Sequence, residues 1–279
     1  MPESLTANGF SLRQSWCDVE NLGPLMVTGA RRGENVEVPG RHGTVRLRHK
    51  RYTEARPSLP MWVLGIDPDT GLTPADPVSQ LHRNLDRLLS VFHAETVELV
   101  HTRPDGSSRM AVVELAAEPT VASRERSYPP MSRVTFDLAM PDPFWADAEP
   151  VYHTIIGVSG TTGDLAEFKG ATAPMSDLVI RFQGPVNNPQ LNFAGGSVFV
   201  KYNGAVSAGR QLVLDTTTWQ VSPGTGTSWN PDVRQVEFAP GPRWLELDPS
   251  ARPFEVEFIH TGGGSAMVSI EGRRRYLTP

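Results

Sequence analysis

Short stretches in which apolar and polar residues alternate recur along most of this 279-residue chain. In the longest of them Val134, Phe136, Leu138 and Met140 alternate with neighbours that are mostly polar. Successive side chains of a β-strand point to opposite faces, so a period of two predicts a strand with one face in a core. Further segments of this kind are 97–102, 110–115, 178–182, 198–202, 233–238, 254–258 and 267–271. The pattern predicts a mainly β protein with antiparallel sheets.

Turn-forming residues separate these segments. Proline, at 25 of 279 residues, is used at nearly twice its average frequency of roughly 5%. Long helices are therefore unfavourable, because proline lacks the backbone N–H that a helix interior needs. The turn sequences are Pro104-Asp105-Gly106, Asn203-Gly204, Pro240-Gly241-Pro242 and Gly262-Gly263-Gly264.

One segment, 77–92, has the period of an amphipathic helix. Its apolar positions are spaced i, i+4, i+7, i+8 and i+11 and are Leu81, Leu85, Leu88, Leu89 and Phe92. Asp76 is suited to the N-cap, and Pro77 to the first helical position, where a missing N–H costs nothing. We therefore predict a single helix that packs one face on a sheet.

The distribution of these signals predicts two domains. The helix signal precedes residue 145, whereas the last hundred residues hold strand patterns at the density typical of a β-sandwich. Between them, 157–174 is rich in Gly, Thr and Ala without a clear period, which indicates a connection. We expect an α+β domain at 1–147, a β-barrel or sandwich with one helix, and an all-β sandwich at 148–279.

Charge and cysteine content exclude several classes of function. The net charge is −5 and is spread over both halves, which disfavours tight binding of nucleic acid. A single cysteine, Cys17, excludes intrachain disulfides and cysteine-based metal sites, and it is best interpreted as core filler. No apolar run approaches the ~18 residues of a membrane span, and the N-terminus lacks the pattern of a signal peptide.

No motif predicts catalysis. The seven histidines are scattered, no nucleophile elbow is present, and the glycine-rich stretches lie between strands rather than before a helix. The pair Glu255 and Glu257 shares a strand face, which is the spacing of two acids in a glycosidase, but solvated strands carry such pairs routinely. We expect no catalytic residue, no metal and no cofactor, and therefore not an enzyme.

A basic segment at 41–52 has two interpretations. It follows Pro39 and Gly40, contains Gly43 and carries its charge on Arg41, His42, Arg46, Arg48, Lys50 and Arg51. In the first interpretation, positive charge protects an exposed sheet edge from aggregation. In the second, which we favour for its density of charge, a hairpin pairs with the acidic surface of a neighbouring subunit.

Two aromatic groups complete the candidate residues. Pro141, Asp142, Pro143, Phe144 and Trp145 end the longest strand, where two prolines fix the exit direction and two aromatic rings cap a core. In the second domain the candidates for stacking on a sugar are Trp219, Trp229 and Trp244. Packing within the core or loops is the favoured interpretation of these three.

The order of these features resembles phage distal tail proteins, the tail-tip or baseplate hubs of siphophages. The segments that resemble their N-terminal domain are 38–43, 61–66, 77–92 and 140–145. Those that resemble their galectin-like C-terminal domain are 177–189, 210–216, 238–241 and the basic-aromatic end 273–277. The resemblance extends over about residues 30 to 279.

The resemblance implies a structural virion protein. Such proteins form a hexameric ring at the distal end of the tail, in which tail-tube-like N-terminal domains build the ring and galectin-like domains project outward. The implied partners are other copies of the chain, the major tail tube protein, the tape-measure protein, the tip or baseplate hub protein and receptor-binding or accessory tail proteins. DNA only passes through the ring, no membrane anchor is implied, and assembly takes place in the host cytoplasm. The alternative is a carbohydrate-binding module of the tail that acts in host adsorption.

Overall fold

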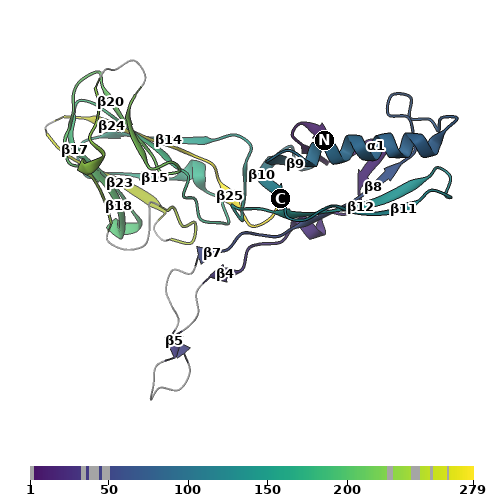
Figure 1. The fold of residues 1–279 in the computed structure, drawn as a ribbon. Helices are drawn as coiled ribbons and strands as arrows, with labels where there is room; N and C mark the ends of the chain where they lie inside the picture. The colour runs from purple at the N-terminus through teal and green to yellow at the C-terminus, as the bar shows by residue number, and fades with distance from the viewer. Residues whose placement is uncertain are drawn as a thin grey trace. The chain divides into compact units, whose positions relative to one another are not determined.

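The chain forms two compact units (Figure 1). The structure is a computed structural model that describes residues 3–32, 36–37, 44–45, 51–224, 229–239, 246–251, 254–262 and 264–279. The first unit comprises Met1–Ala148 and Leu277–Pro279, and the second comprises Glu149–Tyr276. The return of the last three residues to the first unit was not expected from the sequence.

The first unit is built on antiparallel strands. Their bounds are β1 Ser4–Ala7, β2 Phe10–Ser11, β3 Cys17–Val19, β8 Ser58–Leu64, β9 Val97–Thr102, β10 Ser108–Leu115, β11 Thr120–Arg124, β12 Met131–Ala139 and β13 Trp145–Asp147. Hydrogen-bonded neighbours follow the order β2-β1-β9-β10-β12-β8-β3, with β11 on β12 and β13 on β10. A short 3-10 helix, η1, spans Gly23–Leu25.

Strand β12 supplies much of the core of this unit. Val134, Phe136 and Leu138 are fully buried, and the residues between them are exposed or half-buried, which confirms the predicted alternation. The strand pairs with β8 so that Phe136 lies opposite Leu59 and Val134 opposite Met61. Both partners on β8 are fully buried as well, so one face of this strand pair forms the floor of the core.

The predicted helix is confirmed as α1, Pro77–Phe92. The Asp76 carboxylate accepts a hydrogen bond from the Ser79 N–H at 3.1 Å, and this caps the first turn. On the buried face, the ring of Phe92 stacks on that of Phe136 with centroids 4.0 Å apart. The helix thus rests on the sheet by the end of its apolar stripe.

Asn84 departs from the predicted helix face. It is fully buried, whereas the predicted core residues Leu85 and Leu89 are only half-buried. Its Nδ2 donates hydrogen bonds of 2.8 Å to the carbonyls of Leu64 and Ile66, at and just beyond the end of β8. Because both carbonyls lie past the last paired strand residues, this amide ties the helix to the sheet where the backbone ladder ends.

The second unit is a sandwich of two antiparallel sheets. Its strands are β14 Val151–Gly157, β15 Thr161–Asp164, β16 Val179–Gln183, β17 Val186–Phe193, β18 Val198–Tyr202, β19 Ala205–Val206, β20 Gln211–Asp215, β21 Gln220–Pro223, β22 Val236–Phe238, β23 Glu255–Thr261, β24 Ala266–Gly272 and β25 Arg275–Tyr276. One sheet has the order β14-β24-β16-β20-β21 and the other β15-β23-β17-β18-β22, with β19 on β17. Three 3-10 helices are η2 Ala166–Phe168, η3 Ala194–Gly196 and η4 Val233–Gln235.

The core of the sandwich is apolar and aromatic. Phe182 on β16 and Phe258 on β23 are fully buried and stack across the two sheets with ring centroids 5.9 Å apart. Each of these strands alternates buried and half-buried residues along its length. This is the period-two pattern that predicted a sandwich, and the prediction of a mainly β fold is confirmed.

Two local predictions for this unit were wrong. The stretch 157–174 is not a plain connection, because it contains β15 and η2, and β15 forms the edge of one sheet beside β23. The predicted strand at 233–238 begins as the 3-10 helix η4 and becomes a strand only at Val236. Asp232 accepts a hydrogen bond from the Arg234 N–H at 2.9 Å, which favours the turn over the strand.

Candidate functional site

The basic segment predicted as a subunit interface lies mainly outside the described residues. The positions outside them are Pro39, Gly40, Arg41, His42, Gly43, Arg46, Arg48 and Lys50. Arg51 is described only in its backbone, as part of β7. The interface role of these residues therefore stays a prediction.

The described strands around this segment pair as the predicted hairpin requires. Strand β4, Arg31–Arg32, runs antiparallel to β7, Arg51–Tyr52, and β5, Val36–Glu37, runs antiparallel to β6, Thr44–Val45. Two nested antiparallel pairings are the backbone pattern of a β-hairpin. Residues 38–43 are the part of the chain that connects the inner pair.

The base of this hairpin is anchored in the first unit. The ring of Tyr52 packs edge-to-face on Phe144 with centroids 5.1 Å apart, and its hydroxyl accepts hydrogen bonds from Arg31 Nε and Nη2 at 3.2 and 3.0 Å. A Cβ on Gly29 would lie 1.9 Å from the Thr53 carbonyl oxygen, so only glycine permits this close approach. The two motifs that the sequence singled out thus meet at Tyr52 and Phe144.

The motif 141–145 divides between surface and core. Pro141 and Asp142 are exposed, Pro143 is half-buried, and Phe144 and Trp145 are buried. Phe144 is the ring that receives Tyr52. The aromatic residues of this motif therefore support the base of the hairpin as well as the core.

Strand β11 presents a second candidate assembly surface that sequence reasoning missed. All five of its residues are exposed, Val121 to 43%. Among the described strands only β12 pairs with it, so its other edge offers backbone N–H and C=O groups for a further strand. The segment lacks an apolar-polar alternation because neither of its faces is buried, and so no signal of period two could reveal it.

The tryptophans proposed for sugar binding face aromatic neighbours instead. Trp229 packs against the hydrophobic core of the second unit and meets Tyr202 edge-to-face at 6.2 Å. Trp219 meets Phe238 edge-to-face at 5.5 Å. Trp244 lies outside the described residues. The two described rings support the packing interpretation rather than a sugar platform.

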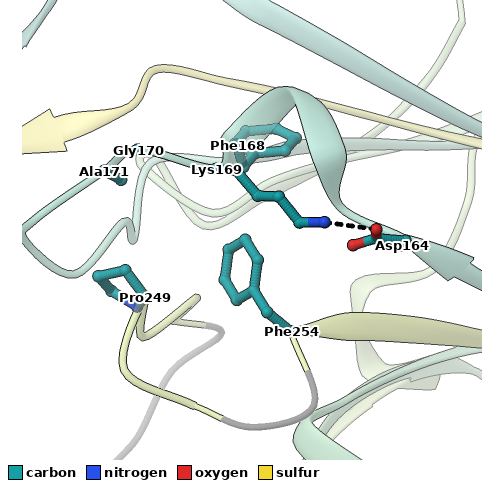
Figure 2. Close-up of a pocket in the computed structure, with 7 residues that line it drawn as sticks. All are labelled: Asp164, Phe168, Lys169, Gly170, Ala171, Pro249 and Phe254. Carbon is teal, nitrogen blue, oxygen red and sulfur yellow. Dashed lines mark hydrogen bonds and ion pairs between the residues drawn. The ribbon is translucent and has the colours of Figure 1, made fainter.

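The second unit also holds a pocket of about 450 Å³ that the sequence did not suggest (Figure 2). It is lined by Asp164, Phe168, Lys169, Gly170, Ala171, Pro249 and Phe254. Figure 2 shows the Phe254 ring between Pro249 and the Lys169 side chain, whose Nζ lies 2.5 Å from Asp164 Oδ2. Segments 164–171 and 249–254 form the pocket together, and their separation in the sequence is why no motif revealed it.

Other chemistry is sparse in the part of the chain that the structure describes. Cys17 is buried in β3, and burial, reinforced by the charge of Asp18, raises the pKa of its thiol to about 12. Such a thiol is inert at neutral pH. Within the described ranges no three His, Cys, Asp or Glu side chains gather as metal ligands would, and no helix is long and apolar enough to cross a membrane.

Comparisons with known proteins return one kind of match. No model of a protein family matches the sequence, and no curated protein matches it. A solved structure does match: the crystal structure of the SPP1 Dit (gp 19.1) protein, described as a paradigm of the hub adsorption apparatus in phages that infect Gram-positive bacteria. The TM-score is 0.63 at 13% sequence identity, and the alignment covers 98% of this chain and 99% of that one. Over nearly its whole length, this chain therefore has the fold of the SPP1 Dit protein.

Proposed function

We propose that this chain is a structural protein of a phage tail, where it forms a ring at the distal end and joins the tail tube to the tip or baseplate. The observation that carries the proposal is the shared fold with a hub adsorption protein over 98% of this chain and 99% of that one. A likeness that spans both units and their order is more informative than a single shared domain, since single folds serve many functions. The role we assign is non-enzymatic.

The ring we propose contains six copies arranged head to tail. In such a ring each copy contacts its two neighbours through two different surfaces. The hairpin that includes the basic segment supplies the first surface. Residues 41–51 hold five Lys or Arg and no Asp or Glu, so subtracting these five charges leaves the rest of the chain at −10, against −5 for the whole. An acidic surface on the next copy is the second surface, and opposite charge favours their association.

The two units take different parts in this proposal. The first, as the domain 1–147, builds the ring, and the second, as the galectin-like domain 148–279, projects from it. The partners are the major tail tube protein, the tape-measure protein, the tip or baseplate hub and receptor-binding or accessory tail proteins, in a virion assembled in the host cytoplasm. DNA passes through the ring, and an acidic chain suits a channel that must not retain it.

The test is the size of the purified protein. We expect sedimentation velocity to give a species of six chains and negative-stain images to show rings. Replacing Arg46→Glu and Arg48→Glu reverses charge in the basic segment and is expected to weaken ring formation roughly tenfold or more. The matched control, Arg83→Glu with Arg234→Glu, makes the same charge change at exposed residues of α1 and η4 and leaves the ring intact.

Two results would contradict the proposal. A monomer at high protein concentration, together with tail preparations that lack the chain, would remove the ring. Equal weakening by both double variants would attribute the effect to net charge, and the basic segment would lose its role as an interface.

A further inference from the structure

The walls of the pocket in the second unit are held by the sheet itself. In the register of β15 and β23, Asp164 lies opposite Glu255, and the Leu165 N–H donates a hydrogen bond to the Phe254 carbonyl at 3.4 Å. The two distant segments that line the pocket are therefore joined by backbone hydrogen bonds at its base. A volume of about 450 Å³ lies within the range of small-molecule sites.

One side of the pocket is a flat carbon surface. Phe254 is half-buried, so part of its ring stays open, while Phe168 behind it is fully buried and holds the wall in place. In Figure 2 the small residues Gly170 and Ala171 line another side of the pocket. A Cβ added to Gly170 would meet nothing within 4 Å, so the space there is open. Such a surface fits the C–H face of a ring-shaped ligand.

The polar groups of the pocket decide what kind of ring fits. Lys169 and Asp164 form an ion pair, and their side chains are 56% and 60% exposed. Because the lining residues carry one positive and one negative charge, the pocket has no net attraction for a phosphate or for an ammonium ion. The pair still offers free ammonium N–H groups beside free carboxylate lone pairs. Hydroxyl groups, which both donate and accept, satisfy the two at once.

We propose that this pocket binds a neutral saccharide, which lays the C–H face of its ring on Phe254 and directs hydroxyl groups to Asp164 and Lys169. The proposal concerns this pocket and does not depend on ring formation. It differs from a site at the tryptophans, since Trp219 and Trp229 already contact aromatic partners. A free monosaccharide and the terminal sugar of a polysaccharide share this chemistry.

Saturation-transfer NMR on the full chain tests the proposal, with neutral methyl glycosides of hexoses and N-acetylhexosamines as probes. We expect transfer to at least one glycoside at millimolar concentration, strongest at the ring C–H protons. Asp164→Ala and Lys169→Ala remove charged hydrogen bonds at exposed positions, and each is expected to weaken binding about tenfold. A disaccharide with the same terminal sugar, if it binds more tightly than the methyl glycoside, identifies a polysaccharide as the source.

The aromatic wall needs a variant that keeps the fold. Phe254 packs against the core of the second unit, so Phe254→Leu retains apolar volume and removes only the flat ring. We expect it to abolish the ring-proton signals, whereas Phe199→Leu, at a half-buried phenyl group on β18 outside the pocket, preserves them. Circular dichroism identical to the parent protein shows that both variants are folded.

Three outcomes would overturn the inference. Absence of transfer from every glycoside would remove the ligand class, and so would preferential binding of inorganic phosphate, choline or a phenylalanine-containing peptide. Transfer that survives both Phe254→Leu and Asp164→Ala would place the saccharide elsewhere on the molecule. None of these results bears on the six-chain ring, so the two proposals fail independently.

Discussion

The two units use their strands in opposite ways. In the second unit, strands such as β16 and β23 bury one face completely against the opposite sheet. In the first unit, β11 buries nothing and pairs on one edge only among the described strands, and a separate hairpin begins at β4. Backbone edges and exposed strands are what a neighbouring chain needs in order to dock. The contrast indicates that assembly belongs to the first unit, whereas the second closes its own core and offers a pocket.

The largest effect we predict is at the aromatic stack of the second unit. Phe258→Ala removes a fully buried ring that stacks on Phe182, and we expect it to lower the free energy of unfolding of this unit by about 3–5 kcal/mol. Urea denaturation measures the loss. The single thiol, Cys17, lies in the first unit and reports on it separately, because it becomes reactive only when that unit opens.

If the units are independent, thiol labelling of the Phe258→Ala protein in the absence of urea stays as slow as in the parent chain. Fast labelling of Cys17 in this variant would show that the first unit unfolds with the second. The comparison between the units would then describe a single cooperative structure.

The next effect is at the polar tie of the first unit. Asn84→Leu keeps the side-chain volume but leaves the carbonyls of Leu64 and Ile66 without their donor, and we expect a loss of about 1–3 kcal/mol. Urea denaturation followed by Cys17 labelling measures it. The control is Leu85→Asn, which places an amide one residue further along α1 at a half-buried position. An Asn84→Leu protein as stable as the parent would mean that water replaces the amide.

The buried thiol gives the first unit a pH dependence that the second lacks. Burial raises the pKa of Cys17 from 9.0 to about 12, so in the folded unit the thiol keeps a proton that the unfolded chain releases. Stability is therefore complete below pH 9 and falls as the pH rises from 9 towards 12, by about 1.4 kcal/mol per pH unit. Cys17→Ala removes this term, and the difference in slope between the two proteins isolates it from other titrating groups. Equal slopes would show that the thiol ionises freely in the folded protein.

How much of this molecule the sequence predicted depends on whether a residue shows its burial through a pattern. Strand β12 and helix α1 have a buried face and an exposed face, so their periods revealed them, and Asp76 was identified because a cap requires only local geometry. Asn84 was missed because an amide in a helix reads as solvent-facing, and only the end of β8 gives it partners. The pocket was missed because residues some eighty positions apart line it.

The smallest effect we predict is at β11, and it sharpens the comparison most directly. Val121→Ser changes a valine that is 43% exposed on a strand whose five residues are all exposed, so we expect the free energy of unfolding to change by less than about 0.5 kcal/mol. The same change at Val268, fully buried on β24, removes core volume and leaves a hydroxyl without water, and it is expected to cost several times more. Thermal unfolding of the two variants measures both. A large loss at Val121 would show that β11 is already packed within the single chain. The absence of one would leave its open edge as a surface that contributes little to the fold and is free for assembly.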